Sequence, residues 1–164
     1  MIINKPANRM FTVKTKSGRR VNFFHFHSLS LVTLGILLLW IVLYSCSDPE
    51  KHAGSFYGNA IADWSGSLVI IVGTKYFFER GSEESRPFKG HLKNTIWNFL
   101  WSHSLSIFLV ITGIGWLLLY LHMNANSKWG QVVGNIVSEW VQTLGLVLMT
   151  KRLLERGSKE SRKC

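Results

Sequence analysis

The chain has 164 residues, of which 47% are hydrophobic and 17% charged, and its formal net charge is +10 at pH 7. A basic balance of this size is typical of proteins that bind nucleic acid or an anionic membrane surface. The sequence contains no helix-turn-helix, zinc-finger spacing or RNP-like motif, so binding to nucleic acid is not expected. The apolar residues are gathered into long runs, which favours a membrane protein.

Four segments have the length of membrane-spanning helices. Residues 28–46 carry no charge, and residues 99–123 contain no Asp, Glu, Lys or Arg. Residues 56–78 and 132–154 are more polar but of similar length. About 20 apolar residues cross a bilayer, and a chain this short cannot bury such runs in a soluble core. The expected fold class is all-α, a polytopic membrane protein with four transmembrane helices; a protein with two spans is the alternative.

Basic residues mark one side of the membrane. Of the 19 Lys and Arg residues, 17 lie before residue 21, between residues 75 and 93, or after residue 150. The other two are Lys51 and Lys128, in the remaining connections. Because short basic loops stay in the cytoplasm, both termini and the middle connection are expected there. The basic tails are also expected to contact the anionic headgroups of the lipid bilayer.

The sequence repeats itself at an offset of 76 residues. Residues 79–86 read ERGSEESR and residues 155–162 read ERGSKESR. The match runs without a gap from residues 22–86 to residues 98–162, with about a third of the positions identical. This indicates a tandem duplication of a two-helix hairpin. The predicted organisation is a basic tail (1–21), a first repeat (22–86), a cytoplasmic linker (87–97) and a second repeat with a basic C-terminal tail (98–164).

The duplication also predicts how the two halves are oriented. Each repeat has an even number of spans, so both should insert the same way and be related by rotation about the membrane normal. The expected architecture is a four-helix bundle of two parallel hairpins, and its symmetry makes a homodimer plausible. Gly81 and Gly157 are expected to end the second helix of each repeat in the left-handed conformation.

Two acidic residues, Asp63 and Glu139, occupy equivalent positions inside predicted spans. A charge at the bilayer centre costs about 2.5–3.5 kcal/mol on insertion scales, so a repeated acid needs a reason. The acids can be protonated, or hydrogen-bonded to a Trp such as Trp40, an Asn or a Ser, and so join helices. Alternatively, they line a path for protons or cations, or form a site for a substrate or lipid headgroup. The candidate residues of this path or interhelical polar site are Asn59, Asp63, Asn135, Glu139 and Gln142.

The repeated octapeptide has two interpretations. It can be a helix stop and interfacial anchor, with cations near the negative end of the helix dipole. It can also be a docking surface for a cytoplasmic protein partner. His27 and His103 are expected at the depth of Glu79 and Glu155. The residues of the possible docking surface are Glu79, Arg80, Glu84, Arg86, Glu155, Arg156, Glu160 and Arg162.

Three short motifs carry a family resemblance. They are Ser-Leu-Ser-Leu at the start of the first predicted helix, Ser-Glu-Trp-Val-Gln at residues 138–142, and Arg-Gly-Ser-x-Glu-Ser at the close of each repeat. They resemble an uncharacterised bacterial family of small multi-pass membrane proteins, known as a domain of unknown function. The second repeat fits better than the first, where Asp-Trp-Ser-Gly stands at residues 63–66. The resemblance implies a bacterial inner-membrane protein and no particular activity.

Catalytic motifs are not recognisable. The sequence has no Ser-His-Asp set, phosphate loop or haem-attachment motif, so neither an enzyme nor a cofactor is expected. His25 and His27 lack a third ligand, so no metal site is expected. The first functional expectation is a structural or interaction component of the inner membrane. The alternative is a small ion or proton channel or carrier that uses Asp63 and Glu139.

Overall fold

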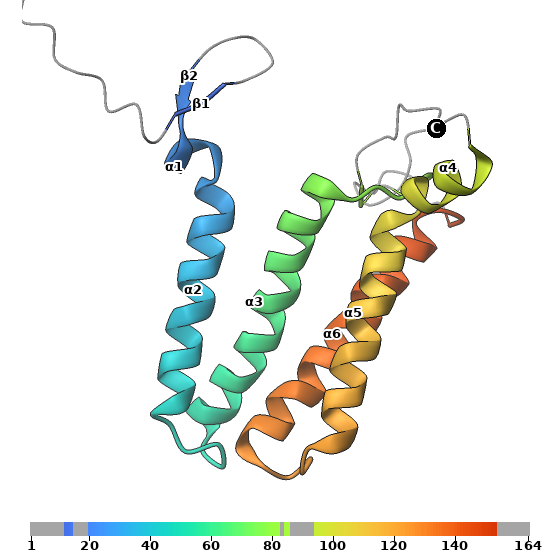
Figure 1. The fold of residues 1–164 in the computed structure, drawn as a ribbon. Helices are drawn as coiled ribbons and strands as arrows, with labels where there is room; N and C mark the ends of the chain where they lie inside the picture. The colour runs from blue at the N-terminus through green and yellow to red at the C-terminus, as the bar shows by residue number, and fades with distance from the viewer. Residues whose placement is uncertain (1–11, 15–19, 83, 86–93, 154–164) are drawn as a thin grey trace, which may run out of the picture.

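The computed structural model describes residues 12–14, 20–82, 84–85 and 94–153. Within these residues the chain is helical apart from one short antiparallel hairpin of strands β1 (Thr12–Lys14) and β2 (Arg20–Asn22) (Figure 1). The helices are α1 (Phe23–Phe26), α2 (Ser28–Ser45), α3 (His52–Tyr76), α4 (Thr95–Ser102), α5 (Ser104–His122) and α6 (Lys128–Met149).

The four long helices form two neighbouring helical hairpins. The first hairpin is α2 with α3, the second is α5 with α6, and α3 packs against α6 between them (Figure 1). The α2–α3 and α5–α6 connections lie at one end of the molecule, while α1 and α4 lie at the other. We call these the connection end and the α4 end. Helix α3 approaches its neighbours closely because small residues predominate among its buried positions; these are Gly54, Gly58, Ala60, Ala62, Gly66 and Gly73.

Among the described residues, α2, α5 and α6 are long and apolar enough to cross a membrane. In their most apolar stretches only 17%, 11% and 28% of the residues are buried. Most of their apolar side chains therefore point outward, as expected where lipid surrounds a helix bundle. Helix α3 is longer, at 25 residues, but contains Asp63 and Lys75 and is less apolar.

The predicted helix over residues 99–123 is wrong at its start. The structure ends α4 at Ser102 and begins α5 at Ser104, with His103 between them in a non-helical conformation. The Ser104 hydroxyl donates to the carbonyl of Trp101 at 2.9 Å, and the Leu105 amide donates to the carbonyl of Phe78 at 3.0 Å. Both bonds replace contacts that a continuous helix would make, which explains the break.

Other boundaries depend on side-chain caps. Helix α6 begins at Lys128 instead of residue 132, because the Ser127 hydroxyl accepts from the Gly130 amide at 3.0 Å. Helix α4 begins inside the predicted linker, after Asn94, whose side chain accepts from the Ile96 amide at 2.9 Å. The strands β1 and β2 occupy part of the predicted tail and of the start of the first repeat.

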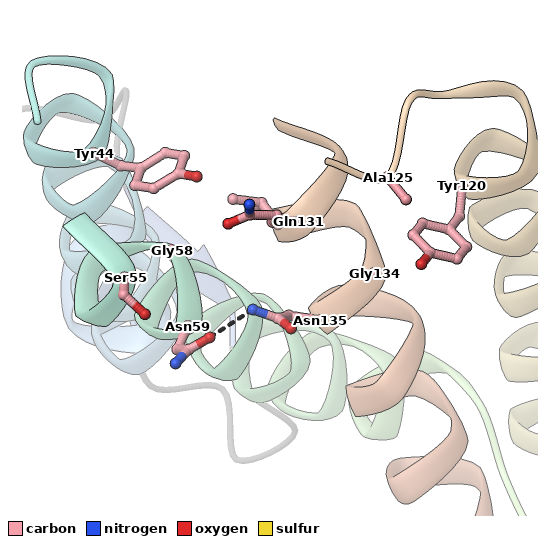
Figure 2. A pocket seen from close by; sticks show the side chains of 10 residues that line it. Tyr44, Ser55, Gly58, Asn59, Tyr120, Ala125, Gln131, Gly134 and Asn135 are labelled. Atoms are coloured by element: carbon pink, nitrogen blue, oxygen red, sulfur yellow. Dashed lines mark hydrogen bonds between the residues drawn. The ribbon is translucent and has the colours of Figure 1, made fainter. Parts of the chain in front are cut away.

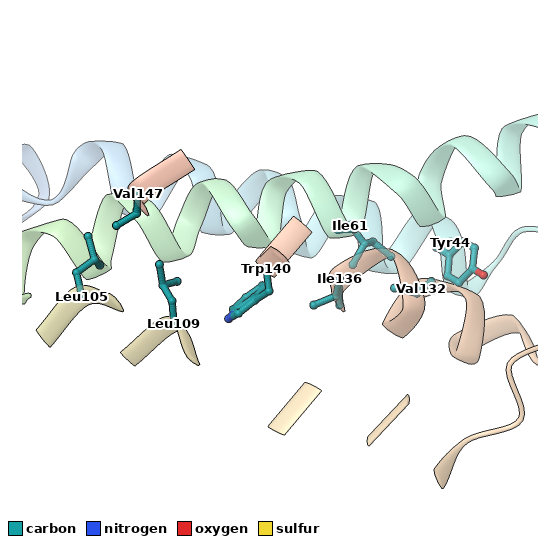
Figure 3. Close-up of a cluster of buried hydrophobic side chains, with 9 residues drawn as sticks. Tyr44, Ile61, Leu105, Leu109, Val132, Ile136, Trp140 and Val147 are labelled. Carbon is teal, nitrogen blue, oxygen red and sulfur yellow. The ribbon is translucent and has the colours of Figure 1, made fainter. Parts of the chain in front are cut away.

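One apolar cluster runs along the four long helices and joins the two hairpins (Figure 3). Its only indole, that of Trp140, donates to the hydroxyl of Thr112 on α5 at 2.9 Å. The cluster holds α3 and α6 in a fixed register, which positions the polar side chains described next. Its buried members are Tyr44, Ile61, Ala62, Leu105, Leu109, Val132, Ile136, Trp140 and Val147.

Candidate functional site

A stripe of polar side chains runs along α3 and another along α6, with one residue every fourth position. Residues four apart share a helix face, so each stripe points in one direction. The α3 residues are exposed, and the α6 residues are exposed or half-buried. We call the two together the polar stripe; it comprises Ser55, Asn59, Asp63 and Ser67 on α3 and Gln131, Asn135, Glu139 and Thr143 on α6.

The two halves of the polar stripe touch at consecutive levels. The Asn135 side-chain amide donates to the Asn59 side-chain oxygen at 2.5 Å (Figure 2). One helical turn further, the carboxyl groups of Asp63 and Glu139 lie within hydrogen-bonding reach of each other. The structure thus brings together four of the five residues predicted for the polar site. The fifth, Gln142, is exposed on α6.

The Glu139 carboxyl group lies directly against the backbone of α3. A methyl group added at Gly66 would lie 3.4 Å from its Oε2 atom. Two carboxyl groups in contact repel each other when both are ionised, so a shared proton or a bound cation stabilises the pair. The neighbouring Asn side chains supply donors and acceptors without charge. The arrangement can therefore hold a proton or a small cation.

A cavity of about 530 Å³ opens at the connection end. Its walls include Ser55 and Gln131, and the Asn59–Asn135 hydrogen bond lies in the same wall (Figure 2). The Asp63–Glu139 pair follows one turn further along the same helices. Since the lining is largely polar, the cavity provides water with a route to the start of the polar stripe. The other lining residues are Tyr44, Gly58, Tyr120, Ala125, Val132 and Gly134.

Tyr44 and Lys128 join the two hairpins at this end. The Tyr44 hydroxyl donates to the carbonyl of Lys128 at 2.5 Å. The Lys128 ammonium group donates to the carbonyls of Ser45 at 3.0 Å and Ser47 at 2.6 Å, and lies 4.9 Å from the centre of the Tyr44 ring. Lys128 therefore satisfies carbonyl groups at the C-terminal end of α2.

A buried carboxylate organises the α4 end. Glu79 is 2% exposed; its Oε1 atom lies 2.6 Å from Nδ1 of His103, and it forms an ion pair with Lys151. Its Oε2 atom accepts from the Ser106 amide at 3.1 Å. Burial by itself raises the pKa of the Glu79 carboxyl group. The hydrogen bonds from Lys151, Ser106 and His103 outweigh burial and hold that pKa below its ordinary value.

The residues after α3 cross the break between α4 and α5. The Arg80 amide donates to the carbonyl of Ser102 at 2.7 Å, and the hydroxyls of Ser82 and Thr150 are 2.9 Å apart. Glu79 is therefore bound inside its own chain, and the docking role predicted for it stays a prediction. Arg80 is exposed and Glu84 half-buried. The predicted residues Arg86, Glu155, Arg156, Glu160 and Arg162 lie outside the described residues, as does Gly157.

The structure also describes His103, Gly81 and Trp40, for which the sequence predicted a contact, a helix end and a hydrogen bond. The expected contact between His103 and Glu79 is present. Gly81 has a positive φ of 92°, as expected, but α3 ends at Tyr76, so Gly81 turns the following segment and does not cap the helix. The bond suggested from Trp40 to Asp63 is wrong. Among the described residues the Trp40 indole nitrogen has no hydrogen-bond partner.

The first hairpin contains a histidine–lysine pair that corresponds to the histidine and lysine in contact with Glu79. Nδ1 of His27 lies 2.9 Å from the ammonium nitrogen of Lys75, and Nδ1 of His103 lies 3.4 Å from that of Lys151. The second pair is displaced from the first by 76 residues. The same histidine–lysine contact is therefore made at the α4 end of both hairpins.

No three His, Cys, Asp or Glu side chains in the described part of the chain are placed to hold a metal ion. No protein-family model, curated protein or solved structure matches the chain.

Proposed function

We propose that this protein crosses the cytoplasmic membrane four times, with α2, α3, α5 and α6 as spans, and conducts protons or small cations along the polar stripe. Helix α3 qualifies as the fourth span because its 25 residues extend about 37 Å. It also packs between two apolar helices, α2 and α6. In the sequence, basic residues are concentrated before α2, between α3 and α4 and after α6, which supports a cytoplasmic location for the α4 end.

Matching contacts support the proposal of two like-oriented hairpins. The Tyr44 ring lies over Gly58, and the Tyr120 ring lies over Gly134; added Cβ atoms would meet these rings at 3.1 and 3.0 Å. Asp48 and Asn124 each accept from the amide two residues later, at 3.1 and 3.0 Å. Each of these contacts recurs at an offset of 76 residues, as a tandem duplication requires.

The observation that carries the proposed conduction is the contact between Asp63 and Glu139 on the exposed polar stripe. Ionisable residues in spans are costly and usually face a bundle interior or a water-filled path. A carboxyl pair that exchanges one proton or cation is suited to relay such an ion. The cavity at the connection end gives the pair access to water from one side.

The alternative, a structural component that docks a cytoplasmic protein through the octapeptides, has less support. Its first octapeptide begins with Glu79, which is buried against His103 and Lys151 of the same chain. A partner would have to displace a charged group from a satisfied buried site, which is costly. The geometry therefore favours transport over docking.

The test is proton and cation flux in proteoliposomes. We expect flux with the unaltered protein and none with the Asp63→Asn/Glu139→Gln variant, because both ionisable groups of the pair are removed. The matched control is Asp48→Asn, which converts an exposed carboxylate at the connection end into the residue found at Asn124. Absence of flux in the folded unaltered protein would refute the proposal, and so would unchanged flux in the double variant.

A further inference from the structure

We propose that α4 lies flat in the headgroup layer of the membrane, with its apolar side chains turned toward the acyl chains of the lipid. The proposal rests on the four-span topology proposed above and does not require that ions are conducted. Five observations support it: the apolar residues that α4 exposes, the polar residues that it turns toward the protein, the length of α5, the break between the two helices, and the continuity of their outer surfaces.

Helix α4 is mostly apolar and mostly exposed. Of its eight residues, five are large and apolar and none is charged. Each of the five is at least 40% exposed. At about 3.6 residues per turn, they cover one broad side of the helix, and water is a poor solvent for a surface of this kind. We call this surface the apolar face of α4; it comprises Ile96, Trp97, Phe99, Leu100 and Trp101.

The polar residues of α4 point toward the protein. Asn98 and Ser102 are four positions apart, so they share one side of the helix. Ser102 is 2% exposed, and its carbonyl accepts from the Arg80 amide at 2.7 Å. The side-chain oxygen of Asn98 is also buried. Helix α4 therefore reverses the pattern of a surface helix in water, whose polar side faces the solvent.

Helix α5 is long enough by itself to cross the hydrocarbon layer. Its 19 residues extend about 28 Å, and the hydrocarbon core of a bilayer is about 30 Å thick. Helix α4 ends one residue before α5 begins, so it lies where α5 reaches the membrane surface. At that level an apolar face meets the boundary between headgroups and acyl chains, where amphipathic helices bind.

The chain changes direction between α4 and α5, which takes α4 out of the line of the span (Figure 1). His103 at the break has a φ of −119° and a ψ of 18°. His27, which separates α1 from α2, has nearly the same conformation, with a φ of −111° and a ψ of 13°. Phe23 and Phe24 of α1 correspond to residues 99–100 and are 38% and 60% exposed. Both repeats therefore place exposed apolar side chains before a break at the start of a long helix.

The apolar face of α4 continues onto the outer surface of α5. Phe99 lines the same apolar groove as Val110 and Ile111 of α5. Ile111 is 64% exposed, as expected of a side chain that faces lipid. Since the two surfaces adjoin, lipid that surrounds α5 also reaches the apolar face of α4.

The tryptophans and the absence of charge identify the kind of lipid contact. Trp97 and Trp101 are four positions apart on the apolar face. An indole combines an apolar ring with one N–H donor, and the headgroup layer offers acyl chains to the ring and oxygen acceptors to the donor. Because α4 carries no charge, its contact does not require anionic lipid, unlike the contact expected of the basic tails.

Fluorescence quenching of the full-length protein in proteoliposomes measures where α4 lies. Cys46 and Cys164 are replaced by Ser, and one new cysteine carries the fluorophore NBD. The labels Ile96→Cys and Leu100→Cys report on α4. The quenchers are phospholipids with a nitroxide near the headgroup, phospholipids with a nitroxide near the end of the acyl chain, and iodide in the water.

Two further labels calibrate the depth. Ile114→Cys reports on the middle of α5, where Ile114 is 52% exposed. Glu50→Cys reports on water, because Glu50 is exposed in the α2–α3 connection. We expect the nitroxide near the headgroup to quench the α4 labels about twofold or more strongly than the one near the chain end, because interfacial helices lie about 5–10 Å deep. Ile114→Cys should show the opposite order, and Glu50→Cys should respond to iodide alone.

The same quenching of α4 is expected in vesicles of phosphatidylcholine alone and in vesicles that also contain phosphatidylglycerol. Quenching by lipid only when phosphatidylglycerol is present would assign the contact to basic segments and contradict the role of the apolar face. Quenching of the α4 labels by iodide alone would place α4 in water. Protection from every quencher would mean that protein, such as a second copy, covers the apolar face. Quenching as deep as that of Ile114→Cys would make α4 part of the span. Each of these results overturns the proposal.

A charge variant tests the apolar face directly. Leu100→Asp should lower the quenching of the Ile96→Cys label by lipid about twofold or more, because a carboxylate leaves the acyl chains for water. Asn94→Asp is the matched control: it adds the same charge at the N-cap position, where Asp also caps a helix, and should have no effect. Equal loss in both variants, or none with Leu100→Asp, would contradict the assignment.

The Ile114→Cys label shows in each variant whether α5 still crosses the membrane. If this label is not quenched from the bilayer centre in the otherwise unaltered protein, the four-span topology fails and the docking of α4 fails with it. If Ile114→Cys is deep while the α4 labels are not at the headgroup level, only the docking fails. None of these measurements uses ion flux, so failure of docking and failure of conduction are distinguishable.

Discussion

Glu79, three residues after the end of α3, lies with its Oε1 atom 2.6 Å from Nδ1 of His103 at the start of α5. This contact joins the end of one hairpin to the beginning of the next, and Lys151, two residues after the end of α6, completes it. The carboxylate also accepts from the Ser106 amide in the first turn of α5.

Glu79→Ala is expected to lower the free energy of unfolding by about 3–5 kcal/mol, because it leaves the Lys151 ammonium group without its carboxylate. Denaturant unfolding in detergent measures the effect. Glu50→Ala is the control, since Glu50 is exposed in the α2–α3 connection and should cost little. Equal stability of the two variants would show that the Glu79 contacts do not stabilise the fold.

Stability should depend on pH through Glu79, whose pKa is lowered in the folded state. The unfolded chain binds more protons between the two pKa values, so stability rises with pH across that interval. The contribution is complete above the ordinary pKa and is lost as pH falls through the lowered one. Unfolding midpoints from about pH 7 to about pH 3 should therefore fall more steeply for the unaltered protein than for Glu79→Gln. Parallel profiles would contradict this assignment.

Gly81→Ala is expected to destabilise the protein by about 1–2 kcal/mol, because Gly81 has a φ of 92° that side chains resist. Gly115→Ala on α5 is the matched control, since an added Cβ atom there meets nothing within 4 Å. Thermal unfolding in detergent compares the two. A loss for Gly115→Ala as large as that for Gly81→Ala would argue against a conformational cause.

Asn59 and Asn135 should be energetically coupled through their 2.5 Å hydrogen bond. A double-mutant cycle with Asn59→Ala and Asn135→Ala is expected to give a coupling energy of about 0.6 kcal/mol, and at most about 1.7 kcal/mol. Unfolding of the two single variants and the double variant supplies the cycle. Strictly additive losses would indicate that α3 and α6 do not meet at this level.

Tyr44→Phe is expected to cost about 1 kcal/mol, because the buried hydroxyl donates to the carbonyl of Lys128. Tyr76→Phe serves as the control, because Tyr76 is 58% exposed at the end of α3. The comparison requires only unfolding measurements in the same detergent. If removal of either hydroxyl had the same effect, the bond to Lys128 would not contribute.

The apolar runs predicted the long helices because their length and lack of charge are local properties. The break at His103 could not be predicted in the same way. It depends on the amide of Leu105 bonding to Phe78, and these residues lie 27 positions apart. The start of α6 is a different case. Ser127, three residues before Gly130, is a recognisable N-cap residue, but the predicted start followed the apolar run instead of this cap.

The candidate site was partly predictable for a similar reason. Asn59 and Asp63, like Asn135 and Glu139, share a helix face by spacing alone. Whether the two faces meet depends on how α3 packs against α6, and the spacing of residues within one helix carries no information about that packing. Ser55 and Gln131 were missed, although they continue the same four-residue spacing in both repeats. The burial of Tyr44 was also hidden, because an aromatic residue at the end of a span usually lies in the interfacial belt.

Lys128 has a consequence for how the protein is made. Its ammonium group satisfies carbonyls at the end of α2, but it is synthesised 83 residues after Ser45. At about 5–20 residues per second, the ribosome reaches it about 4–17 s later. In the four-span topology proposed above, the first hairpin would spend that interval without the Lys128 ammonium group at these carbonyls. The end of α2 therefore gains these contacts only after the second hairpin has been synthesised. The order of synthesis thus sets the order in which the two hairpins can pack.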